Sequence, residues 1–137
     1  MGFEIQPHTA DVAVEATADT LDELFAHLGD GMAACMIDDI PDEVGERFEV
    51  TVEATDLEAL LFDYLDELIF ERDVRNVMPV DNAVTIESTE SGYSLHGSAR
   101  GVPLELLSAR EVKAVTYADM IVEETDDGWY GYVVLDV

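Results

Sequence analysis

The sequence has 137 residues, 48% of them hydrophobic, and a formal net charge of −26 from 32 acidic and only six basic side chains. These values are typical of a globular chain that folds as one domain over residues 1–137, and they exclude a disordered protein. No apolar run is long enough to cross a membrane and no secretory signal is recognisable, so we expect a cytoplasmic protein with no membrane partner. The single cysteine, Cys35, excludes an internal disulfide and a cysteine-rich zinc site.

The excess of acids has two interpretations. One is a mimic of nucleic acid or a binder of basic partners, and the other is a solvated surface adapted to high salt. The acids are spread over every segment instead of forming a tail, which favours the second interpretation and a halophilic source. Under either interpretation the chain lacks a Lys/Arg cluster. We therefore expect no tight direct binding to nucleic acid.

The first part of the chain predicts strand and then helix. Residues 3–17 favour one or two short strands, because apolar and polar residues alternate from Val12 onward. Residues 8–11 are interpreted as a bend at the start of the second strand. A helix is expected over residues 20–36, where Thr20 and Glu23 form a capping box ahead of a stripe of leucines. Two glycines, Gly29 and Gly31, are expected to weaken this first helix by roughly 1 kcal/mol each relative to alanine.

A second strand and a second helix follow. Residues 47–54 alternate as a clear strand. The next helix begins with a second capping box at Thr55 and ends near Glu71, and its apolar stripe is so broad that we expect it to be sandwiched between other elements.

Three acids of this second helix share one ridge at four-residue spacing. They are Asp63, Glu67 and Glu71. Like charges at this spacing repel by roughly a few tenths of a kcal/mol. We interpret the ridge as a solvated face rather than a metal site.

The rest of the chain predicts strands separated by turns, over residues 84–88, 93–100, 112–117, 120–125 and 129–137. Residues 101–103, which include Gly101 and Pro103, are expected to break the second of these strands. Residues 104–109 give no clear pattern. The order strands, helix, strand, helix, strands predicts an α+β fold of mostly antiparallel sheets, with two amphipathic helices packed between or against them.

Lys113 is the only lysine of the chain and lies between apolar neighbours in a run rich in β-branched residues. A lone cation in such a run is expected to have an anionic partner, because isolated charges are costly to bury. Lys113 with nearby carboxylates could also be an acid–base pair of a hydrolase. Neighbouring acids favour the charged lysine, which is a poor base at neutral pH, and no nucleophile motif is present, so an enzyme is disfavoured.

Two acids stand at unusual places. Asp11 begins a strand, and Asp136 follows an apolar run and precedes Val137. If the first and last strands are neighbours, the two carboxylates and an oxygen of Val137 converge, and such oxygen clusters suit Ca²⁺ or Mg²⁺. His8 shares the bend with Asp11. His27 and His96 are interpreted as surface or satisfied core residues.

Three short runs, in order along the chain, carry a resemblance to a known family. They are His8–Asp11 (His-Thr-Ala-Asp), Glu111–Tyr117 (Glu-Val-Lys-Ala-Val-Thr-Tyr) and Val133–Val137 (Val-Val-Leu-Asp-Val). With the leucine-rich helix from Asp56 to Leu68, they resemble the archease family over nearly the whole chain.

The resemblance implies an accessory protein of the RtcB-type RNA ligase, which joins tRNA halves in tRNA splicing, and not an enzyme. It implies that the protein promotes the guanylylation of that ligase from GTP and its multiple turnover. It further implies a divalent metal, Ca²⁺ by preference with Mg²⁺ or Mn²⁺ as alternatives. The implied ligands are Asp11, Asp136 and a terminal or main-chain oxygen of Val137, and Lys113 and His8 are placed on the functional surface.

The chain departs from the family pattern at two places. Ala118 stands where many members have a histidine, and residues 103–110 lack another histidine often found there. Roles of those histidines are therefore not carried over. The alternative hypothesis is a general protein chaperone or modulator with a purely structural metal site, which would act on its clients without GTP.

Overall fold

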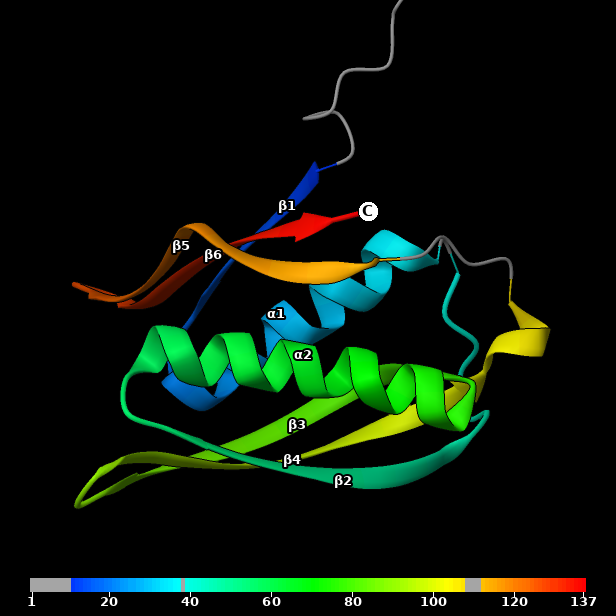
Figure 1. Cartoon of the computed structure of the whole chain (residues 1–137), viewed down its shortest axis with the longest axis horizontal. Helices are drawn as coiled ribbons and strands as arrows, with labels where there is room; N and C mark the ends of the chain where they lie inside the picture. The colour runs from blue at the N-terminus through cyan, green and yellow to red at the C-terminus, as the bar shows by residue number, and fades with distance from the viewer. Residues whose placement is uncertain (1–10, 38, 108–111) are drawn as a thin grey trace, which may run out of the picture.

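Two three-stranded antiparallel sheets enclose two helices (Figure 1). The computed structural model describes residues 11–37, 39–107 and 112–137. Its elements are β1 (Asp11–Ala18), α1 (Leu21–Met36), β2 (Glu46–Ala54), α2 (Leu57–Arg75), β3 (Val77–Thr89), β4 (Gly92–Pro103), the short 3₁₀ helix η2 (Leu104–Leu106), β5 (Ala114–Thr125) and β6 (Gly128–Asp136). One sheet has the strand order β1-β6-β5 and the other β2-β4-β3. The α+β prediction is confirmed.

The core lies between the sheets, where both helices are packed. α2 contacts strands of both sheets, and α1 contacts β1, β3 and β6. The largest fully buried side chains include Phe25 of α1 and Tyr64 of α2, whose ring centroids are 6.2 Å apart. The prediction that the second helix is sandwiched is therefore confirmed, and its broad stripe of leucines is explained by burial on two sides.

The helix boundaries differ in part from the sequence prediction. The hydroxyl of Thr20 accepts a hydrogen bond from the Glu23 amide at 3.2 Å, as the capping box predicts. In α2, however, the N-cap is Asp56 and not Thr55, with its carboxylate 2.8 Å from the Ala59 amide. The expected end at Glu71 was also wrong, because α2 continues to Arg75. Two arginines in the last turn suit the negative end of the helix dipole.

Two strands are longer than predicted because local breakers sit where the sheet tolerates them. β3 contains Pro79 but is an edge strand, where a missing amide costs least. The expected break at residues 101–103 was wrong. Gly101 pairs with Glu46 on one side and Pro79 on the other, and a Cβ there would lie 2.9 Å from Val77.

The predicted strands 112–117 and 120–125 form a single strand, β5. Its pairing with β6 is irregular between Thr116 and Ile121, where Asp119 has a positive φ of 56°. An inserted segment of this kind bends a strand without ending it. None of the helices in the described ranges is long and apolar enough to cross a membrane.

Glycine lets α1 approach the sheet β1-β6-β5 closely. A Cβ on Gly31 would lie 2.5 Å from Val14 of β1, and a Cβ on Gly131 of β6 would lie 2.8 Å from Leu28 of α1. These distances are shorter than carbon atoms tolerate. Gly31, which the sequence identifies only as a weak point of the helix, is thus required for its packing.

Candidate functional site

The predicted site residues of three distant segments meet at one end of the sheet β1-β6-β5. In the antiparallel register Asp11 of β1 lies opposite Asp136 of β6, and Ala114 of β5 lies opposite Asp136 on the other side. The amide of Lys113 donates a hydrogen bond of 2.7 Å to the carbonyl oxygen of Asp136. Figure 1 shows the start of β1 beside the end of β6. The expectation that the first and last strands are neighbours is confirmed.

The carboxylates of Asp11 and Asp136 project from the outer face of this sheet. Burial alternates along β6, with Val133 and Leu135 facing the helices, so Asp136 faces outward and is half-buried. Asp11 is exposed on the same face. Directly opposed residues of an antiparallel pair have Cβ atoms about 4.5–5.5 Å apart, and like charges so placed repel. A cation between them would remove that repulsion.

The donor set fits a hard divalent cation in type but supplies few protein ligands. Carboxylate and carbonyl oxygens are the ligands that Ca²⁺ and Mg²⁺ prefer. Asp11 and Asp136 make no side-chain hydrogen bond or ion pair with other described residues, so both remain available. The described ranges contain no group of three His, Cys, Asp or Glu side chains arranged for a metal. Main-chain oxygens such as that of Val137, and water, would have to complete the shell. His8 lies outside the described residues.

Lys113 differs from its expected environment. Its side chain is exposed, and the residue lies just before β5 instead of inside it, while the preceding Val112 is 1% exposed. No carboxylate of the described residues forms an ion pair with it. Among the described residues, the expectation that Lys113 has an anionic partner is therefore wrong. Its side chain is exposed to water, which removes the need for such a partner.

The four described arginines, by contrast, all have partners within the chain. Arg47 donates to the Asp81 carbonyl oxygen at 2.7 Å, and Arg75 pairs with Glu71 at 2.6 Å. Arg100 contacts the Asp81 carboxylate, and Arg72 the carboxylate of the adjacent aspartate. Lys113 is thus the one described cation whose side chain has no partner among the described residues.

Arg72 connects the core to the candidate site, a role that no local sequence pattern indicated. Its Nη1 donates to the carbonyl oxygen of Val112 at 3.0 Å and contacts the sulfur of Met36 at 3.2 Å. The residue is only 6% exposed. Position 72 continues the buried spacing of Leu65 and Leu68, a signal that was lost because the helix was expected to end at Glu71.

Comparisons with known proteins show the family to which the chain belongs. The model of the archease protein family (MTH1598/TM1083) matches residues 3–137. The chain belongs to the archease family. The archease of Thermococcus gammatolerans is 40% identical over 98% of both chains, and that of Methanopyrus kandleri is 34% identical over 100% of both. The family expected from the three sequence runs is confirmed.

Two solved archease-family structures resemble the fold. The solution structure of Methanobacterium thermoautotrophicum protein 1598 has a TM-score of 0.79 and 29% identity, covering 98% of this chain and 96% of that one. A crystal structure of a Thermotoga maritima archease, described as a possible chaperone, has a TM-score of 0.68 and covers 100% and 98% of the two chains. At 22% identity, the second supports the fold alone.

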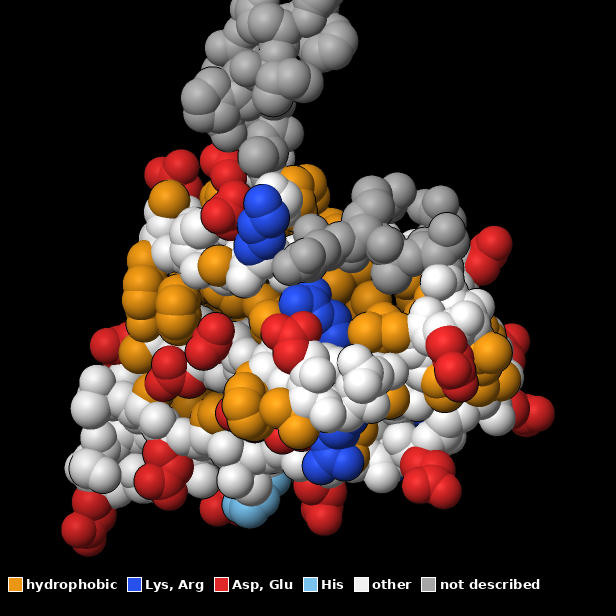
Figure 2. All heavy atoms as spheres, turned by 45° about the vertical axis from the view of Figure 1, so that its right-hand side comes forward, with side chains coloured by type: hydrophobic (Ala, Val, Ile, Leu, Met, Phe, Trp, Pro, Cys, Tyr) orange, Lys and Arg blue, Asp and Glu red, His pale blue; other side chains and the backbone are white. Residues whose placement is uncertain are grey.

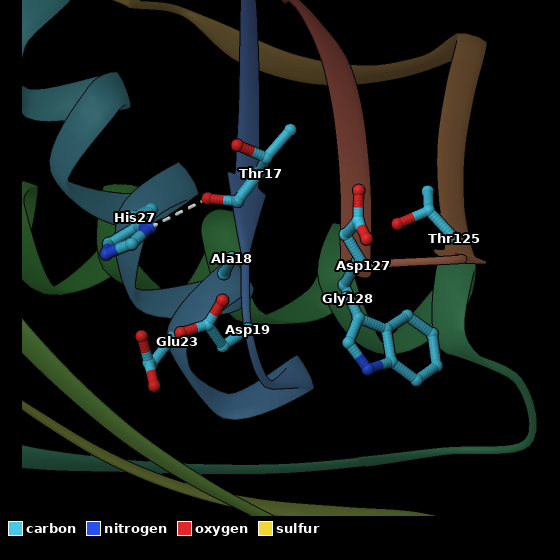
Figure 3. Close-up of a pocket in the computed structure, with 9 residues that line it drawn as sticks. Thr17, Ala18, Asp19, Glu23, His27, Thr125, Asp127 and Gly128 are labelled. Atoms are coloured by element: carbon cyan, nitrogen blue, oxygen red, sulfur yellow. Dashed lines mark hydrogen bonds between the residues drawn. The ribbon is translucent and has the colours of Figure 1, made fainter.

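A hollow of about 490 Å³ lies at the other end of the same sheet and does not belong to the Asp11–Asp136 site. Figure 3 shows His27, Asp19 and Asp127 around it, from α1, the residues after β1 and the turn before β6. The ring nitrogen Nδ1 of His27 donates to the carbonyl oxygen of Thr17 at 3.3 Å. His27 is therefore a surface residue with a main-chain partner, as the sequence predicted.

Proposed function

We propose that this chain is a metal-binding accessory protein that activates an RtcB-type RNA ligase in tRNA splicing. It promotes the guanylylation of the ligase, for which the ligase uses GTP, and its multiple turnover. The observation that carries the proposal is the meeting of Asp11, Asp136 and Lys113 at one sheet end in a member of the archease family. The chain itself supplies no catalytic residue to the reaction.

A divalent metal at this end, Ca²⁺ by preference and Mg²⁺ or Mn²⁺ otherwise, would supply positive charge between the paired carboxylates. Asp11 and Asp136 would hold it together with an oxygen of Val137. Because Asp11 and Asp136 belong to neighbouring strands, holding one cation fixes the ends of β1 and β6 relative to each other. Lys113, whose main chain is held against Asp136, then presents its ammonium group to an anionic group of the partner.

The charges of the chain support a protein partner over RNA. Phosphate binding depends on free lysine and arginine side chains. All four described arginines have partners within the chain, which leaves only Lys113 of the described cations available. We therefore propose that this protein acts on the ligase and does not bind the RNA substrate of the ligase.

The test is a ligation assay with the ligase of the same organism, GTP and split tRNA. The wild-type protein should raise the number of turnovers per ligase molecule. Asp11→Ala should abolish the effect, whereas Glu49→Ala, on the exposed face of β2 in the other sheet, should retain it. Absence of any wild-type effect on ligase turnover would refute the proposal.

The alternative is a general chaperone with a purely structural metal. The description of the Thermotoga maritima archease as a possible chaperone favours this function for that protein. The alternative predicts that the chain protects unrelated clients, such as thermally unfolding citrate synthase, from aggregation without GTP. Protection of such clients at stoichiometric amounts, together with no effect on the ligase, would favour the chaperone over the activator.

A further inference from the structure

α2 exposes large apolar side chains near its C-terminal end. Phe70 and Val74 expose 55% and 62% of their surfaces, and Tyr117 of β5 exposes 54%. Phe62, Asp66, Phe70 and Val74 follow one another at four-residue spacing along the helix, so the exposed Asp66 lies between the two phenylalanines. We call Phe62, Phe70, Val74 and Tyr117 the α2 face. Exposed large hydrophobic side chains grouped in this way mark interaction sites in soluble proteins.

The α2 face contains a stacked pair of aromatic rings, which we call the aromatic platform. The rings of Phe62 and Tyr117 stack with centroids 4.2 Å apart and planes inclined by 5°. The stack joins α2 to β5, so its two rings are held by different elements of the fold. A preordered apolar surface loses little conformational entropy when a partner binds it.

Asp63, Asp66 and Glu67 of α2 make no ion pair with a described residue, whereas Glu71 pairs with Arg75. Burial and the nearby charge of Asp66 raise the pKa of Asp63. Burial, a hydrogen bond to Glu71 and the charges of Glu71 and Asp66 raise the pKa of Glu67. Figure 2 shows hydrophobic side chains exposed among acidic ones, with a few Lys and Arg side chains between them. The negative charge around the α2 face is thus unfavourable in the isolated protein, and cations of a partner would relieve it.

We propose that the α2 face docks a partner protein whose contacting surface has apolar side chains flanked by lysine and arginine. The proposal rests on the proposed function, in which that partner is the RNA ligase. A second copy of this chain is the wrong occupant, because it would bring a second set of acids against Asp63, Asp66 and Glu67. The carboxylates of Asp11 and Asp136 project from the face of the sheet β1-β6-β5 that points away from the helices, so docking on the α2 face leaves them free to act on the ligase.

Binding of the ligase to surface variants tests the docking site. The double variant Phe70→Ser/Val74→Ser changes only exposed side chains and should raise the dissociation constant by roughly tenfold or more. Asp66→Lys should raise it several-fold at low salt and less at high salt. The matched controls are Ile40→Ser, an exposed apolar residue outside the face, and Glu49→Lys on β2. Control variants and face variants that all bind like wild type would overturn the proposal.

Ligase guanylylation, measured in parallel, separates the two proposals. If the double variant binds the ligase and stimulates its guanylylation as the wild type does, the docking site is overturned and the activator function is retained. Binding that depends on the α2 face but brings no stimulation supports the docking site and overturns the activator function. No binding of the ligase by the wild type overturns both. Sedimentation that shows a dimer abolished by the double variant would assign the face to self-association instead.

Discussion

The amide of Lys113 donates a 2.7 Å hydrogen bond to the carbonyl oxygen of Asp136, so the lysine and the aspartate are fixed to each other through the main chain. The Lys113 side chain is exposed and takes no part in this bond. The position of the lysine is therefore set by its neighbours and not by its charge. Val112, held by Arg72 from α2, is the nearest of these neighbours.

Replacing Arg72 with leucine should destabilise the fold. The substitution leaves the buried carbonyl oxygen of Val112 without its donor, which costs about 1–3 kcal/mol of unfolding free energy. Denaturant unfolding measures the effect. Arg75→Leu on the same helix is the control, because its partly exposed ion pair with Glu71 and its contact with the Phe48 ring are each worth about 1 kcal/mol or less and leave no buried group without a partner. Equal losses in both variants would contradict the role given to Arg72.

Asp136→Asn should abolish stabilisation by calcium. Added Ca²⁺ should raise the melting temperature of the wild-type protein, because a ligand that binds only the folded state stabilises it. The variant should show no such rise. Without metal it should be at least as stable as wild type, since one of two facing carboxylates has lost its charge. Glu49→Gln should behave like wild type, and a calcium-dependent rise in Asp136→Asn would argue against the site.

Glu67→Gln should stabilise the protein at neutral pH. The raised pKa of Glu67 means that the folded state binds this proton more strongly than the unfolded state. The resulting stabilisation is complete below the pKa of the unfolded state and is lost as the pH rises through the raised value. Glutamine carries no charge at any pH, so the variant avoids that loss. Its free energy of unfolding should rise by roughly a few tenths of a kcal/mol for each like-charge pair removed. Its advantage in chemical denaturation should disappear in acid, and an advantage that grows in acid would reverse the argument.

For the Gly31→Ala variant, the sequence alone and the structure predict opposite changes in stability. Helix propensity alone predicts a gain of about 1 kcal/mol. The new Cβ would lie 2.5 Å from Val14, and overpacking of this kind costs about 1–3 kcal/mol, so we expect a net loss of unfolding free energy. Adding Val14→Ala should recover part of the loss. If Gly31→Ala alone is more stable than wild type, the close packing of α1 on β1 is wrong.

Local patterns predicted the elements well where one face of an element is buried and the other is exposed. The alternation from Val12 and the capping box at Thr20 gave β1 and α1 nearly to the residue. The pairing of the first and last strands could only be assumed, because no local signal in the sequence specifies which strands are neighbours. The meeting of Asp11 and Asp136 is a property of sheet topology.

The missed features depend on contacts between distant segments. Pro79 and Gly101 look like strand breakers, yet one lies on an edge strand and the other fills a place too narrow for a side chain. Arg72 looks like a surface residue of a helix end, but it is buried against Val112 and the end of α1. The exposed position of Lys113 follows from where β5 begins, which its β-branched neighbours do not determine.

The most direct test of the activator function is the fraction of ligase that carries covalent guanylate after a fixed time with GTP. This fraction is measured for the ligase alone, for the ligase with wild-type protein and for the ligase with the Asp136→Asn variant. Both added proteins are present at a lower concentration than the ligase. We predict that wild-type protein raises this fraction and that Asp136→Asn leaves it at the level without addition. Equal stimulation by Asp136→Asn and wild type would contradict the assignment of function to the Asp11–Asp136 end of the sheet.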